Sequence, residues 1–401
     1  MGLVFFMRMR ILALVLAVAV LAGCGYSRTE PLPYPEPAAS EPGRTVAYVP
    51  LDDRPDTVER VEYLAESVGY ALAMPERVLY RTALDHQPKN FDSIQRGEPW
   101  SLYTWVLNQE AAGCDRYILS LDQLHSGGLV SSRSLIGDEL EIPGGGTASA
   151  SQLVENLLAK LAEDENNVVW LLDSVMRLAP TVGYEGGTLE EYNALRAYGA
   201  EPRETLEGRE ELTFANVCVS YRYGANGEPL AEPEGVGPEL VEDYLAARER
   251  KLRLSDEVQR ILAQPGYENF RLLIGIDDSS LEDCIQKNEI AYLRRGLRTE
   301  EGEDEWHERQ IDWLLSGVDD LAFKAVTRMY LDETGWVGYS ANVQYVGGTE
   351  DRPACEYDFQ PLCEIVHEHF QFFDLLEGRA AQLHVLVLTQ PEDESLKQAY
   401  I

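Results

Sequence analysis

The chain has 401 residues, of which 45% are hydrophobic and 26% are charged. It is therefore long enough for a large buried core, and its composition is neither that of a disordered chain nor that of a fibrous one. The 69 acidic residues outnumber the 34 basic residues and give a formal net charge of −35. Because nucleic-acid binding draws most of its affinity from basic groups that neutralise phosphates, this charge argues against a nucleic-acid partner.

The first 23 residues have the pattern of a signal peptide. Arg8 and Arg10 precede an apolar run at 11–21, and the sequence Leu21-Ala22-Gly23-Cys24 ends it. This ending resembles the bacterial lipobox, in which the signal peptide is removed and the cysteine is lipidated. We therefore expect lipidation at Cys24; an uncleaved anchor with an incidental cysteine is the alternative.

A proline-rich segment follows the expected cleavage site. Residues 24–44 contain prolines at 31, 33, 35, 37 and 42 and few residues that a core would bury. Such a composition predicts an extended stalk. We expect an exported protein whose lipid at Cys24 attaches it to the cell membrane or cell surface.

Apolar runs alternate with amphipathic stretches from residue 45 to the end of the chain. The expected strands are 46–49, 70–74, 116–121, 168–172, 271–276, 313–316, 337–345 and 383–388. The expected helices are 56–69, 100–112, 149–163, 281–295, 321–331 and 358–376. This alternation predicts an α/β domain at 45–401 with a mostly parallel sheet.

Eight expected strands fit a (β/α)8-barrel-like fold with a helical insertion at about 180–267. This insertion ends in a long charged helix at 238–262. Doubly wound open sheets in two related halves are the alternative, because Asp52-Asp53 and Asp277-Asp278 follow similar apolar stretches.

Aspartates come after five of the expected strands. In parallel α/β folds the carboxyl ends of all strands open on one side, where ligands bind, so these side chains are expected to meet there. A single aspartate in this place is as often a helix cap or turn former, but the doubled aspartates exceed what capping requires. The five groups are Asp52-Asp53, Asp122, Asp173, Asp277-Asp278 and Asp319-Asp320.

These residues suggest a site for carbohydrate chemistry. Glycoside hydrolysis needs one carboxylic acid and a second carboxylate, which we expect to come from Asp52 or Asp53 and from Asp277 or Asp278. The other candidates would bind substrate or supply counter-charge, although His125 alone is more often structural. They are Arg54, Asp122, His125, Asp173, Arg177, Arg248, Asp319 and Asp320.

The first hypothesis is accordingly an exported glycosidase that requires no cofactor. The alternative is a surface lipoprotein that binds sugar or a cation without turnover, since carboxylates are also ligands of Ca²⁺ and Mg²⁺. Metal-assisted hydrolysis of a phosphoester is the third and weakest possibility. The partner in each case is a small polar ligand.

Several blocks of the chain resemble an uncharacterised bacterial family, domain of unknown function 4127. The matching blocks are Pro50-Leu51-Asp52-Asp53-Arg54-Pro55, Ser120 to Leu124, Gly127 to Arg133, Val175-Met176-Arg177, Glu190-Glu191-Tyr192 with Tyr198-Gly199, Asp243 to Arg250, Ile276-Asp277-Asp278 and Gly317-Val318-Asp319-Asp320. The last block has Gly-Ala-Asp-Glu in the family, and the family's C-terminal segment with Gly-Trp-Asn-Thr is absent, so we expect a C-terminally shortened member. The resemblance implies no established activity.

Overall fold

The computed structural model describes residues 44–90, 94–142, 145–280, 283–301, 308–335, 338–378 and 381–389, all of which belong to one compact unit. The expected signal peptide, Cys24 and all but the last residue of the expected stalk lie outside these ranges. Among the described helices, none is both long enough and apolar enough to cross a bilayer.

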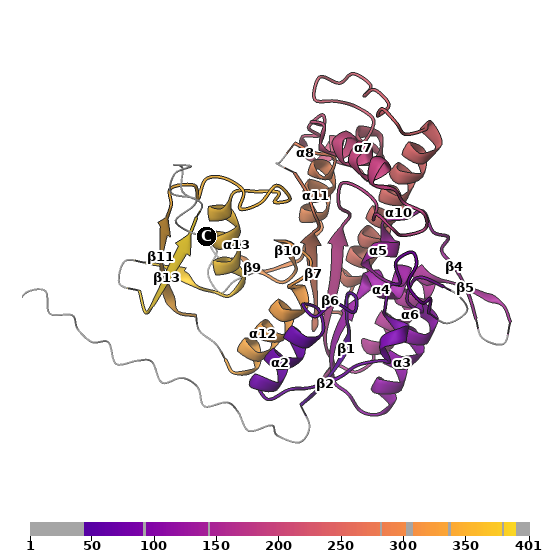
Figure 1. The fold of residues 1–401 in the computed structure, drawn as a ribbon. Coiled ribbons are helices and arrows are strands. Elements are labelled where there is room, and N and C mark those ends of the chain that lie inside the picture. Colours follow the sequence, from indigo (N-terminus) through magenta and orange to yellow (C-terminus); the bar gives the residue numbers. More distant parts are fainter. Residues whose placement is uncertain are drawn as a thin grey trace, which may run out of the picture. The chain divides into compact units, whose positions relative to one another are not determined.

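A six-stranded parallel sheet forms the centre of the fold (Figure 1). Its order is β2 (Ala71–Ala73), β1 (Thr45–Val49), β3 (Arg116–Ser120), β6 (Val168–Val175), β7 (Phe270–Ile276) and β10 (Trp313–Ser316). The register aligns Ala47 with Tyr117, Leu119 with Leu171, and Ser174 with Gly275. The order reverses direction between β1 and β3, which is the switch point where doubly wound sheets bind ligands.

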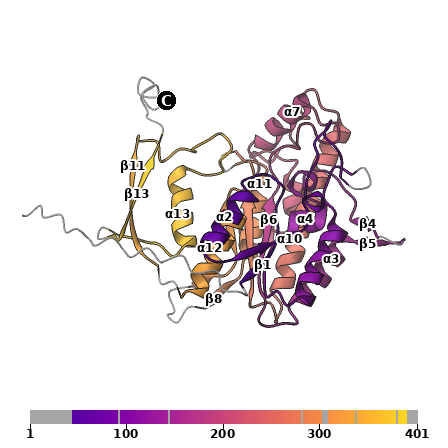
Figure 2. The same cartoon turned by 60° about the horizontal axis from the view of Figure 1, so that its bottom comes forward.

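Helices cover both faces of this sheet because alternate strand residues point to opposite sides. Tyr48, Ile118 and Trp170 pack on one side with α2 (Glu59–Ser67) and α12 (Leu321–Glu333). These two helices lie side by side in both ribbon views (Figure 2).

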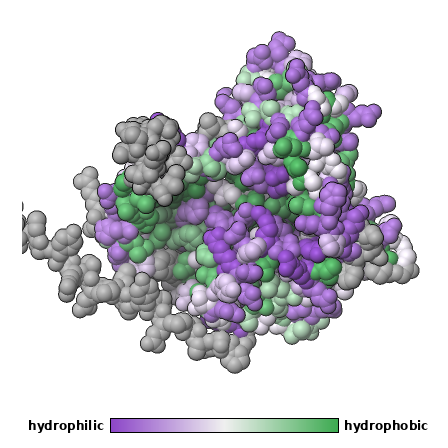
Figure 3. Space-filling model, in the orientation of Figure 1, coloured by the Kyte–Doolittle hydropathy of each residue, from purple (hydrophilic) through white to green (hydrophobic). Residues whose placement is uncertain are grey.

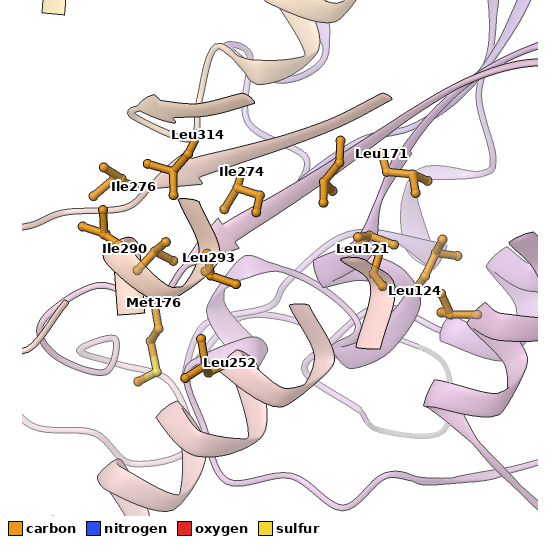
Figure 4. Packing of buried hydrophobic residues seen from close by; sticks show 14 of the residues in the cluster. Leu121, Leu124, Leu171, Met176, Leu252, Ile274, Ile276, Ile290, Leu293 and Leu314 are labelled. Atoms are coloured by element: carbon orange, nitrogen blue, oxygen red, sulfur yellow. The ribbon is translucent and has the colours of Figure 1, made fainter. Parts of the chain in front are cut away.

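The other face packs against four helices. They are α3 (Pro99–Ala111), α6 (Ala150–Leu161), α10 (Pro238–Leu262) and α11 (Gln286–Arg295). Figure 4 shows Ile274 of β7 and Leu171 of β6 in the same layer as Leu252 of α10 and Leu293 of α11. Burial on both faces explains why these strands have nearly continuous apolar sequences.

The β6–β7 connection contains the expected insertion. It consists of α7 (Leu189–Ala200), α8 (Gly208–Glu211), α9 (Phe214–Ser220) and α10. The long charged helix expected at 238–262 coincides with α10. The remaining short elements near the sheet are η1 (Arg77–Leu79), α4 (Leu121–Ser126), α5 (Leu129–Ser132), β4 (Glu139–Glu141), β5 (Thr147–Ser149), β8 (Thr299–Glu301) and β9 (Glu308–Gln310).

The C-terminal part forms a second, smaller sheet. It has the parallel order β12 (Leu376–Glu377), β11 (Ser340–Val346) and β13 (Leu383–Leu388), next to α13 (Leu362–Phe372). Leu386 and Leu388 remain exposed, and Figure 3 shows apolar side chains over this sheet.

The expected α/β architecture with a mostly parallel sheet is confirmed. The eight expected strands divide between two sheets, six in the large one and two in the small one, and in the described residues these sheets are open. The large sheet also contains both the Asp52-Asp53 and the Asp277-Asp278 stretches, at the ends of β1 and β7.

Gly275 in β7 allows the loops after β7 and β10 to approach each other. A Cβ atom at this position would lie 2.3 Å from the Gly317 carbonyl oxygen and 2.8 Å from Val318 Cγ1. The Gly317 N–H donates to the Ile276 carbonyl at 3.0 Å. This close approach of the two loops therefore also sets the positions of the aspartates that follow β7 and β10.

We expect Gly275→Ala to lower the free energy of unfolding by about 1–3 kcal/mol, because the methyl group overpacks this contact. Urea unfolding measures the change. Gly137→Ala is the matched control, since a Cβ at Gly137 would meet nothing within 4 Å. Equal stability of the two variants would contradict the proposed role of Gly275.

Candidate functional site

A cavity of about 680 Å³ lies at the carboxyl edge of the large sheet. We call it the central cavity. Five aspartates and five arginines line it, together with apolar and neutral polar residues. The charged residues are Asp52, Asp53, Asp277, Asp278, Asp319, Arg54, Arg77, Arg81, Arg133 and Arg177. Their formal charges balance, although the whole chain carries −35.

The turn after β1 places the first pair of aspartates. Asp52 is buried, and its carboxylate accepts hydrogen bonds from the Arg54 backbone N–H at 3.0 Å and from Thr57 Oγ1 at 2.8 Å. Arg54 Nη2 lies 2.7 Å from Asp52 Oδ2 and 2.6 Å from Asp319 Oδ1. Asp52 therefore fixes the turn, and Arg54 connects the loops after β1 and β10.

Asp53 points toward the central cavity and contacts Arg77 of η1. Its carboxylate lies 2.8 Å from Arg77 Nη2, and its side chain is 17% exposed. Asp53 is less enclosed than Asp52 and does not hold the turn. It is therefore the member of this pair that a ligand can reach.

The turn after β7 has the same division of roles. Asp277 is buried and pairs with the buried Arg133, whose Nη2 lies 2.6 Å from Asp277 Oδ2. Asp278 is 42% exposed and contacts Arg177 Nη1 at 3.3 Å. Arg177 is held by the carbonyl oxygens of Ala179 and Pro180, so its position is set by the chain after β6.

Arg133 reaches the cavity through two short helices. Gly127 adopts a left-handed conformation, with φ of 75°, and ends α4. The chain then turns into α5, where Ser131 donates to the Ser126 carbonyl, and Arg133 follows as the C-cap residue. Glycine favours this conformation because it has no Cβ atom.

Five of the expected substrate-binding residues, Asp122, His125, Asp173, Arg248 and Asp320, do not line the central cavity. Asp122 and Asp173 are buried and share Lys251 of α10, whose Nζ lies 2.7 Å from Asp122 Oδ1 and also contacts Asp173. Asp173 was expected after a strand, but it lies within β6, which continues to Val175. Burial favours neutral Asp122, yet the contacts with Lys251 and Ser174 outweigh it and lower the pKa of this carboxyl.

Arg248 likewise has a structural position. It is fully buried on α10, pairs with Glu289 of α11, and donates to the Arg177 and Met176 carbonyl oxygens. Through these hydrogen bonds Arg248 holds the backbone of the segment that carries Arg177. Helical spacing places Arg248 and Lys251 on one face of α10, and this was the sequence signal that could have identified Lys251.

Asp319 and Asp320 separate at the end of β10. Asp319 lines the central cavity, whereas Asp320 contacts Lys324 at 3.0 Å and lies 3.8 Å from His369 Nε2. Asp320 lines a neighbouring cavity with His369. No group of three or more His, Cys, Asp or Glu side chains in the described ranges is arranged to hold a metal ion.

Sequence reasoning identified Arg54 and Arg177 but missed the other three arginines of the central cavity. Arg77, Arg81 and Arg133 line the central cavity, but they come from short elements without a repeated pattern. Arg133 closes one of the blocks that resemble the family, which was the one available indication.

The comparisons with known proteins identify a family. The family described as "Protein of unknown function (DUF4127)" matches residues 46–399. Neither a curated protein nor a solved structure gives a significant match.

We expect Lys251→Met to lower the free energy of unfolding by about 3–5 kcal/mol, because it leaves two carboxylates buried without their cation. Denaturant unfolding tests this. Adding Asp122→Asn and Asp173→Asn should recover part of the loss. Lys160→Met, which removes an exposed pair with Glu163, is the control and should leave the midpoint almost unchanged. An equally small change of the unfolding midpoint in Lys251→Met would contradict the assignment of Lys251 as the cation shared by the two buried carboxylates.

His125 should stay neutral in the folded protein well below pH 6. Burial, and then Lys251 and Arg250, lower its pKa to about 3. The unfolded chain binds a proton near pH 6.5 and the folded chain does not, so this histidine lowers stability as the pH falls.

The free energy of unfolding of His125→Gln, relative to that of the wild type, should therefore rise by about 2 kcal/mol when the pH is lowered from 7 to 5. Urea unfolding at both pH values measures this. His384→Gln, at an exposed position of β13, is the control. A difference that is independent of pH would refute the buried neutral state.

On the match over residues 46–399, the chain belongs to the DUF4127 family.

Proposed function

We propose that the protein is an exported, lipid-anchored hydrolase that cleaves a glycosidic bond in the central cavity. The observation that carries this proposal is the cavity itself, which brings aspartates from the ends of β1, β7 and β10 to one edge of the sheet. Its volume lies within the range of about 300–1,000 Å³ that is typical of ligand sites. The sequence features at residues 1–44 support export and the anchor at Cys24.

Asp53 and Asp278 are the proposed catalytic pair. Each is the more accessible member of its aspartate pair, whereas Asp52 and Asp277 hold Arg54 and Arg133. One of the two carboxyls protonates the leaving oxygen, and the other acts as nucleophile or as the base that activates water. Arg77 and Arg177 orient them and offer further donors to sugar oxygens or to an acidic substituent.

A second candidate is sugar binding without turnover. It is favoured by the pairing of all five cavity aspartates with arginine, which leaves each carboxylate already engaged. The same pairing speaks against a cation-binding role, because Ca²⁺ or Mg²⁺ would have to displace guanidinium groups from the carboxylate oxygens.

The test is turnover of cello-, chito-, xylo- and malto-oligosaccharides and of aryl glycosides by the full chain. We expect Asp53→Asn and Asp278→Asn each to lower kcat by about 10²–10⁴, the range for loss of a general acid or base. Thermal unfolding should show that both variants remain folded.

Asp115→Asn is the matched control. Asp115 also pairs with an arginine, Arg116, but it lies at the opposite edge of the sheet, before β3. Its replacement should leave kcat unchanged. Full activity of both Asp53→Asn and Asp278→Asn would refute the mechanism, and sugar binding without any product would favour the second candidate.

A further inference from the structure

Two more cavities adjoin the central cavity. The insertion cavity, of about 320 Å³, shares Arg133 and Thr181 with it. The C-terminal cavity, of about 460 Å³, shares Asp277, Asp278 and Asp319 with it. The central cavity thus adjoins both of the other cavities through shared wall residues.

The outer walls of the flanking cavities come from outside the sheet. Tyr192 of α7 and Asp243 of α10 line the insertion cavity. Tyr357 and His369, from the segment before α13 and from α13 itself, line the C-terminal cavity. Each flank therefore presents an aromatic ring together with polar groups, the combination that fixes a polar ligand with apolar ring faces.

Contacts between these walls hold them in place. Arg196 of α7 stacks over the Tyr357 ring at 4.5 Å and donates to the Glu356 carbonyl oxygen at 3.1 Å. It also donates to the Ser279 carbonyl oxygen at 3.3 Å, next to the catalytic candidate Asp278. The insertion and the C-terminal segment are thus both attached to the loop that follows β7.

Tyr192 is connected to the same loop through an arginine. The Arg177 guanidinium lies 5.6 Å from the centre of the Tyr192 ring and also contacts Asp278. A ligand unit seated against Tyr192 therefore adjoins the residues that would act on the next unit. The shared wall residues and these arginine contacts distinguish the arrangement from three unrelated surface hollows.

We infer that the three cavities are consecutive subsites for an oligosaccharide of at least three units, with cleavage in the central one. This inference rests on the proposed glycosidase function and specifies its substrate class. The units on either side of the scissile bond gain contacts with Tyr192 and Asp243 or with Tyr357 and His369. Such remote contacts raise kcat/KM when they are used to position the bond.

The test compares chain lengths from one to six units in the cello-, chito-, xylo- and malto-oligosaccharide series, with the full chain. We expect kcat/KM for the cleaved series to rise at least about tenfold between the disaccharide and the tetrasaccharide. Tyr192→Ala and Tyr357→Ala should each reduce that ratio. Tyr63→Ala, at an exposed site on α2, is the matched control and should not change it.

Binding separates this inference from the proposed function. Calorimetric titration of Asp278→Asn with the same series should give a lower Kd for longer chains, and the tyrosine variants should weaken that trend. Tighter binding of longer chains without turnover would support the subsites and refute the hydrolase. Turnover or binding that is independent of chain length would overturn the subsites, and neither binding nor turnover would overturn both.

Discussion

Carboxylates at the edge and in the core of this sheet require cationic partners, and that requirement organises the rest of the structure. An ionised carboxylate removed from water is costly unless a cation and hydrogen bonds compensate it. Lys251 does this for Asp122 and Asp173, and thereby attaches α10 to β6 and to α4 after β3. Arg133 does it for Asp277 and brings α5 to the end of β7. The ion pairs therefore join parts that are distant in the sequence.

The same requirement divides each aspartate doublet into two roles. Asp52 and Asp277, the first of each pair, are buried and hold arginines that close the turns. Asp53 and Asp278 follow them, contact other arginines and line the cavity with greater exposure. One residue thus stabilises the turn while its neighbour faces the central cavity. This arrangement explains why a single capping aspartate would not suffice at these two strand ends.

Several features were predictable because they depend on local periodicity. Each of the eight expected strands overlaps a strand of the structure, and α10 has the expected bounds, since apolar alternation and amphipathic spacing are properties of short windows. The convergence of Asp52, Asp53, Asp277, Asp278 and Asp319 followed from the common direction of parallel strands. Asp122, His125, Asp173, Arg248 and Asp320 do not line the central cavity, because residue type and strand proximity do not reveal where a side chain points.

The sequence by itself determined the α/β class, the parallel sheet, the family and the edge at which the acids collect. Tertiary structure alone decided which acids are buried and which arginines they meet. Arg77, Arg133 and Arg177 reach Asp53, Asp277 and Asp278 from elements 24, 144 and 101 residues away, so no local pattern encodes those pairs. The physical reason is that strand direction is a local property, whereas charge compensation depends on how separate elements pack around one cavity.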